Sequence, residues 1–169
     1  METRTILDTT HKQDQALHSL GVKYSTSLIA DHFDYNGQLI KSYDLGSGLV
    51  TDAGVAFMSA SFTGATAINA FNYHGSGIDG TAATTGDTTV SLSAGIPARS
   101  VGVQTCPASG TYRTVGLQTY TANTAIQEWG LFSALNAGTM WDRKTFAVIN
   151  VGNGDSISFT YNLTCQSGG

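Results

Sequence analysis

The sequence predicts an all-β fold, either an antiparallel sandwich or a jelly roll. In the run 156–164, apolar and polar residues alternate without interruption, as in a strand with one buried face and one wet face. Short runs of similar character continue from residue 53 to the end, separated by turn residues and without a strong helical period. The chain also contains 20 glycines, 23 threonines and 16 serines, which favour strands and turns.

The first residues predict an arm rather than part of a core. Asp8 or Thr9 can cap a short helix that Gly21 closes. The apolar residues between these ends cover only part of one helical face. We therefore expect residues 1–25 to become ordered mainly against another surface.

A hairpin and a charge boundary follow the arm. The turn sequence 35–38 lies between two runs, 29–35 and 38–43, that are compatible with paired strands. Residues 1–52 carry seven acidic and four basic residues, whereas residues 53–169 carry five and four. This shift predicts an N-terminal docking segment, made of an extended arm and a hairpin, and then a separate β-sandwich domain.

The second region predicts eight or more strands. The loop 75–88 is assigned from its glycine and threonine content, and Pro97 and Pro107 fall at strand junctions because proline lacks a backbone donor. The expected strands are 54–62, 67–74, 89–92, 101–105, 111–121, 125–134, 139–142, 144–151 and 156–164. The residues expected in the core are Ile157, Phe159, Tyr161, Leu163, Phe146, Val148, Val115, Leu117, Leu131 and Phe57.

Composition limits the partners. Only 12% of the residues are charged, about half the usual share, which indicates that much of the surface meets other subunits. A net charge of −4 argues against nucleic acid, since binding phosphates needs a basic face. No run approaches the length of a membrane helix, and Met1–Arg4 lacks the apolar core of a signal peptide. Whether Cys106 and Cys165 pair is left open.

The histidines do not predict a metal site. His11 and His18 can share one helical face, but no cysteine or carboxylate completes a ligand set around them. His32 lies next to Asp31 and close to Asp34, and exposed polar residues flanking a hairpin strand explain that cluster better. We expect no metal and no other cofactor.

Two further candidates for chemistry are also better explained by structure. The glycines of 75–80 lack the lysine and the following helix of a phosphate-binding loop, so they predict a turn. Glu128 lies among apolar residues of an expected strand, which suggests a buried acid. Such an acid needs a partner, either Arg143 or Arg113 on a facing strand, and we prefer that role to one as a catalytic acid. No catalytic residue is predicted, and we expect a protein that is not an enzyme.

Two stretches resemble segments of small structural proteins of tailed bacteriophages. The first is Asn72 to Thr88, and the second runs from Ala125 through Arg143 and Phe146 to Ile157. With their spacing they cover roughly residues 49–169. Similar segments occur in head-associated proteins and in some tail-fibre modules.

The resemblance implies a non-enzymatic virion protein without catalytic residues. The expected function is that of a capsid cement or decoration protein, assembled in the host cytoplasm, which binds the major capsid protein on the capsid surface. Self-association, as a homotrimer, is expected from the same analogy and from the low charge.

Two other functions are compatible with the sequence. One is a tail-fibre or receptor-binding module whose exposed aromatic residues, such as Tyr73, Trp129 or Trp141, contact host glycans. The other is an enzyme such as a depolymerase domain. Copy number in the virion separates the first of these from a cement protein, and an assay for sugar release tests the second.

Overall fold

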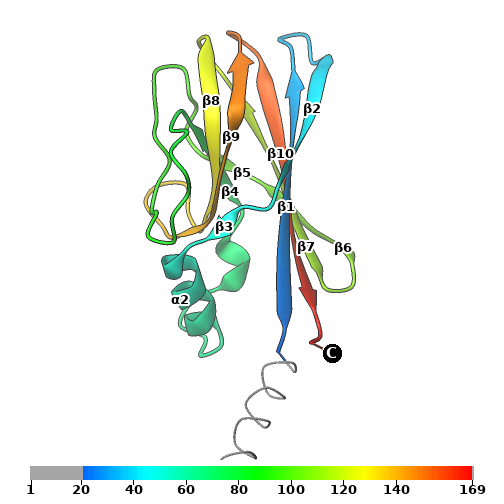
Figure 1. The fold of residues 1–169 in the computed structure, drawn as a ribbon, viewed down its shortest axis with the longest axis vertical. Coiled ribbons are helices and arrows are strands. Elements are labelled where there is room, and N and C mark those ends of the chain that lie inside the picture. Colours follow the sequence, from blue (N-terminus) through cyan, green and yellow to red (C-terminus); the bar gives the residue numbers. More distant parts are fainter. Residues whose placement is uncertain (1–20, 169) are drawn as a thin grey trace, which may run out of the picture.

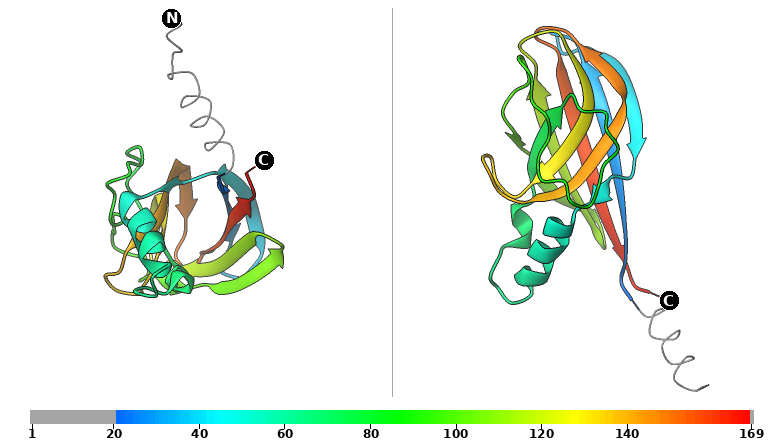
Figure 2. Two further views of the ribbon diagram at one scale, coloured as in Figure 1. Left: turned by 90° about the horizontal axis from the view of Figure 1, so that it is seen from below. Right: turned by 60° about the vertical axis from the view of Figure 1, so that its left-hand side comes forward.

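The protein is a two-layer β-sandwich. A computed structural model describes residues 21–168, and the arm expected over 1–25, with His11 and His18, lies almost entirely outside the described residues. Two antiparallel sheets of five strands pack face to face and are not closed into a barrel (Figures 1 and 2). The all-β sandwich expected from the sequence is confirmed.

The first sheet has the strand order β2-β1-β10-β7-β6. Its central strand, β10, pairs with β1 on one side and β7 on the other. The strand bounds are Lys23–Phe33 for β1, Leu39–Gly46 for β2, Val103–Ala108 for β6, Thr111–Thr119 for β7 and Ser156–Gln166 for β10.

The second sheet has the order β3-β9-β8-β4-β5. Its longest pairing joins β8 and β9, and residues 133–139 connect these two strands. The bounds are Leu49–Val50 for β3, Tyr73–Gly77 for β4, Ser100–Val101 for β5, Thr124–Phe132 for β8 and Met140–Val151 for β9.

The N-terminal hairpin belongs to the sandwich. Asp34 accepts hydrogen bonds from the backbone of Asn36 and Gln38, and Gly37 takes a positive φ of 78°, so the expected turn forms between β1 and β2. However, β1 pairs with β10 along its whole length and buries Leu28 in the core. The boundary expected at residue 52 therefore does not separate a docking segment from the sheets, because long-range pairing with β10 outweighs the local difference in charge.

The expected strand 54–62 is wrong, because this segment is the helix α2 (Asp52–Ser61). Thr51 caps it by accepting a hydrogen bond from the Gly54 backbone at 3.0 Å, and the Thr51 hydroxyl donates to the Met140 carbonyl at 2.6 Å. The more buried positions, 54, 57, 58 and 61, have helical spacing. Over so few residues, the alternation in the sequence did not distinguish the two-residue period of a strand from the 3.6-residue period of a helix.

Other elements also differ in extent. The expected strand 67–74 divides into a 3₁₀ turn, η1 (Ile68–Ala70), and the start of β4. Residues 89–92 are not a strand, and β4 extends to Gly77, inside the segment expected to be a loop. The glycines of β4 are strand residues buried under neighbouring segments, so they form no phosphate-binding loop.

The core lies between the sheets and is centred on Trp129. Its ring stacks on Tyr161 at 5.3 Å between centroids and lies 6.3 Å from Phe159. Among the residues expected in the core, Ile157, Phe159, Tyr161 and Leu131 are buried, and Leu163, Phe146 and Phe57 pack against the core while partly exposed.

Three expected core residues lie elsewhere. Leu117 is 55% exposed and Val115 lies on the same outer face of β7, because Thr114, Gly116 and Gln118 face inward. Val148 is 45% exposed. It lies in a bulge of β9, where the pairing of Ile126 with Ile149 changes to that of Glu128 with Thr145, so alternation is lost there.

Candidate interaction site

A long segment without regular structure covers the outer face of the second sheet. Residues 78–99 connect β4 to β5, and Figure 2 shows the first part of this segment in front of the strands. Val90 packs on Phe132 and Met140 in a second, smaller apolar cluster on this side of the sheet. Backbone hydrogen bonds also hold the segment, including one from Asp52 at the start of α2 to the Thr85 carbonyl at 2.9 Å. The second sheet is thus buried on both faces at residues 74–77 of β4 and 128–132 of β8.

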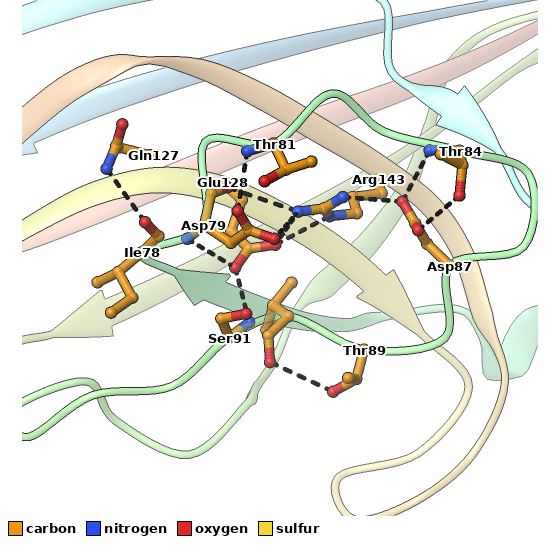
Figure 3. A network of polar contacts seen from close by, with 11 residues as sticks. Ile78, Asp79, Thr81, Thr84, Asp87, Thr89, Ser91, Gln127, Glu128 and Arg143 are labelled. Atoms are coloured by element: carbon orange, nitrogen blue, oxygen red, sulfur yellow. Dashed lines mark hydrogen bonds and ion pairs between the residues drawn. The ribbon is translucent and has the colours of Figure 1, made fainter.

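Arg143 contacts three carboxylates, two of which belong to this segment, as Figure 3 shows. Its Nη2 lies 2.8 Å from Glu128 Oε2, its Nη1 lies 2.8 Å from Asp87 Oδ2, and its Nη2 lies 3.2 Å from Asp79 Oδ2. We call these four residues the Arg143 cluster. Arg143 and Glu128 come from β9 and β8, whereas Asp79 and Asp87 come from the covering segment.

Glu128 is completely buried and its hydrogen bonds are satisfied locally. Its Oε1 accepts from the backbone of Ser91 at 2.6 Å and of Asp79 at 3.1 Å, while Oε2 faces Arg143. A side chain at Gly77 would overlap Oε1, so glycine there lets the carboxylate lie across β4. Of the two partners expected for Glu128, Arg143 is the one that pairs with it. The other candidate, Arg113, donates to Asn162 instead.

Three members of the cluster, Arg143, Asp87 and Asp79, have shifted pKa values that favour their charged forms. Burial opposes the charge on Arg143, but the hydrogen bonds that it donates to Asp87 and Glu128 outweigh burial and raise the arginine pKa. Burial also acts against the ionisation of Asp87, yet bonds from the Thr84 backbone and Arg143 lower its pKa. The pKa of Asp79 is lowered, first by its hydrogen bonds with Thr81. One cation and three carboxylates leave a net negative charge, and both oxygens of Glu128 are occupied.

A buried histidine lies between the sheets. The Trp129 indole donates to His74 Nδ1 at 3.2 Å, so Nδ1 is the acceptor and the ring proton is on Nε2, which donates to Thr114 Oγ1 at 3.1 Å. Burial lowers the pKa of His74 to about 3, so the ring is neutral at physiological pH. A side chain at Gly116 would overlap the ring. The residues next to His74 in the sequence, Tyr73 and Gly75, gave no sign of this role.

A buried carboxyl lies beside the same core. Tyr161 receives a hydrogen bond from the Trp141 indole at 2.8 Å and donates its own to Asp142 Oδ2 at 3.0 Å. Burial raises the pKa of Asp142 to about 6. Its Oδ1 has no hydrogen-bond partner and lies against Gly48. Proximity of Asp142 to Arg143 in the sequence is misleading here, because alternation along β9 sends the two side chains to opposite faces.

The environment of His32 differs from the exposed position expected for it beside the hairpin. His32 is buried rather than exposed, and its Nε2 lies 3.0 Å from Asp155 Oδ2 in the turn before β10. The pKa of Asp155 is lowered, first by the Gly152 backbone amide. Asp34 is used by the hairpin turn, and Asp31 faces away from His32 on the strand. Within residues 21–168, no group of three histidine, cysteine or acidic side chains is placed to hold a metal ion.

An apolar groove opens at the end of the sandwich where α2 lies. It has a volume of about 610 Å³, and none of the residues that line it is charged. We call it the α2 groove; its walls include Tyr24, Phe62, Ile68, Phe71, Trp141 and Leu163. Cys106 and Cys165 also line it, and both thiols are free and exposed. The residues come from both sheets, α2 and η1, so no local sequence pattern predicts the groove.

The aromatic residues suggested for glycan binding are not exposed. Trp129 is completely buried, Trp141 is 5% exposed and Tyr73 is only partly exposed. Both indoles donate hydrogen bonds inside the core. A glycan site on these three residues is therefore not available at the surface.

Comparisons with known proteins give no relative. No family model, no curated protein and no solved structure matches the chain. Among residues 21–168 there is no helix that is long and apolar enough to cross a membrane.

Proposed function

We propose that this protein is a non-enzymatic structural component of a tailed-bacteriophage virion. In this proposal it is a capsid cement or decoration protein that binds the lattice of the major capsid protein and stabilises the head. The proposal comes from the resemblance of two stretches of the sequence to phage structural proteins.

The observation that supports it best is that the two resembling stretches meet in space. Asp79 and Asp87 belong to the first stretch, and Glu128 and Arg143 belong to the second. The Arg143 cluster joins them into one unit, in which a long surface segment is held firmly on a sheet. A firmly held segment is suited to docking on a rigid lattice, since little conformational entropy is lost on binding.

The outer face of the first sheet offers a second surface suited to subunit contact. β10 presents Ser158, Thr160 and Asn162 there, next to Arg113, Val115 and Leu117 of β7. Small, mostly uncharged side chains on a regular sheet allow close approach of another protein at a small cost in desolvation.

A reconstruction of particles that contain the protein tests the proposal. We expect tens to hundreds of copies at symmetry axes of the head, in contact with the major capsid protein. A few copies at the tail would overturn the proposal and favour a tail-fibre or receptor-binding module. A binding assay with purified heads that lack the protein gives a second test, and failure to bind them would also contradict it.

A further inference from the structure

The α2 groove and an exposed aromatic side chain lie on the same patch. Phe62 follows the last turn of α2 at the rim of the groove and is 83% exposed. Ile68 and Tyr24, on the same rim, are 48% and 49% exposed. A highly exposed aromatic side chain beside an apolar groove is typical of an interaction surface and unusual on a protein that stays monomeric.

The absence of charge in the α2 groove favours an uncharged binding partner. None of its lining residues is charged, so a charged segment would lose hydration there without gaining an ion pair. The uncharged surface that carries Phe62 meets this requirement. Residues 1–20, which precede β1, carry three acidic and two basic residues and fit less well.

We propose that the α2 groove is an interface with a second copy of this chain, in which Phe62 of one copy enters the groove of its neighbour. Because the aromatic side chain and the groove share one patch, each copy both inserts and receives. Contacts of this kind close about a symmetry axis instead of extending into a filament. This inference goes beyond the proposed function, because it concerns the purified protein and holds whether or not the protein is found on a virion.

Sedimentation velocity of the full chain at micromolar concentration tests the proposal. We expect the wild-type protein to sediment as a closed oligomer and Phe62→Asp to sediment as a monomer, because a carboxylate cannot be buried in an uncharged groove. Phe62→Leu should remain an oligomer. Leu92→Asp is the matched control, since Leu92 is 66% exposed in the segment that covers the second sheet, and it should leave the oligomer intact.

The two thiols provide a readout that is specific for this interface. Cys106 and Cys165 line the groove, so a second copy should shield them from N-ethylmaleimide. We expect them to react at least about tenfold faster in Phe62→Asp than in the wild type, the change that about 1.4 kcal/mol of protection produces. Circular dichroism should show the same β-spectrum for both proteins, because Phe62 packs little in the single chain.

Three outcomes would overturn the proposal. A monomeric wild type with fast-reacting thiols would mean that the groove is open. A monomeric wild type with protected thiols would mean that residues 1–20 of the same chain cover it. An oligomer that Phe62→Asp does not dissociate would place the contact elsewhere. A virion location at the tail would contradict the proposed function alone and leave this interface standing.

Discussion

The two sheets of the sandwich differ in how many of their faces are buried. In the first sheet, β10 alternates between buried and partly exposed residues, because only its inner face meets the core. In the second sheet, β8 is buried at every residue from Glu128 to Phe132, and β4 from His74 to Gly77. The Arg143 cluster and Val90 hold residues 78–99 over the outer face of that sheet. A sheet that is covered on both faces loses the period of two by which strands are recognised.

This difference also concerns where charge is placed. The buried outer face of the second sheet contains an ion cluster in which Arg143 pairs with three carboxylates. The exposed outer face of the first sheet carries serine, threonine and valine side chains, with Asp31 of β1 and Arg113 of β7 among them. Charge in this protein therefore does not simply mark the solvated surface.

The largest expected effect tests the one-sided character of the first sheet. Phe159→Ala removes a fully buried ring next to Trp129 and should lower the free energy of unfolding by about 3–5 kcal/mol. Thr160→Ala, on the outer face of the same strand, should change it by no more than about 0.5 kcal/mol. Urea titrations of both variants measure this. Equal losses would mean that the outer face is covered too.

The next effect tests the outer face of the second sheet. Arg143→Met leaves the buried Glu128 without its cation and should cost about 3 kcal/mol, the lower end of the range for broken buried pairs, because Asp79 is partly solvated. Arg113→Met, on the first sheet, is the matched control and should cost less than about 1 kcal/mol. If the two substitutions cost the same, the Arg143 cluster does not fix the covering segment.

The double variant sharpens that test. Glu128→Gln combined with Arg143→Met removes both charges while Oε1 can still accept the bonds from Ser91 and Asp79. It should be more stable than Arg143→Met alone, because the uncompensated buried charge is gone. Thermal unfolding of the four proteins gives the coupling free energy, and additive effects would contradict a direct interaction.

The pH dependence of stability probes the inner face of the second sheet. The pKa of Asp142 is about 6 in the folded protein and 3.8 ordinarily, so the folded state binds the proton more tightly. The stabilisation is complete below about pH 4 and is lost as the pH rises through 6. Asp142→Asn should therefore gain stability over the wild type between pH 4 and pH 7, by up to about 3 kcal/mol. A difference that stays constant over this range would contradict a buried, protonated Asp142.

His74 should produce the opposite slope. Its pKa is about 3 in the folded protein, below its ordinary 6.5, so the unfolded chain binds the proton more tightly. Stability from this group is complete above pH 6.5 and is lost as the pH falls toward 3. A His74→Gln variant should lose less stability than the wild type over that interval. Parallel curves for the two proteins would show that His74 does not stay neutral.

The smallest effect concerns the face of β7. Leu117→Thr exchanges an exposed apolar side chain and should change the free energy of unfolding by no more than about 0.5 kcal/mol. In the same strand, Gly116→Ala should destabilise the protein clearly, because the added methyl group overlaps the His74 ring. A large loss in Leu117→Thr would contradict the assignment of Leu117 to the outer face.

The sequence determined the class of fold, the hairpin at Asn36–Gly37 and the inner face of β10. These follow from local causes, namely alternation in a strand with one wet face and the backbone needs of a tight turn. It also predicted that Glu128 is a buried acid paired with an arginine, because a buried acid requires a cation, but it left Arg143 and Arg113 as alternatives. Phe159 and Tyr161 were placed correctly for the same local reason.

Only the tertiary structure decided which face of β7 is inside, that residues 52–61 are a helix, and that His74, Asp142 and the α2 groove exist. Gly116 makes room for a histidine that is distant in the sequence, so Leu117 points outward although it is the more apolar residue. The α2 groove is made of residues from two sheets and a helix, and its uncharged character appears only when they are brought together. Alternation in the sequence indicates which residues of one strand face the core. The features named here depend instead on which distant segments pack against that strand.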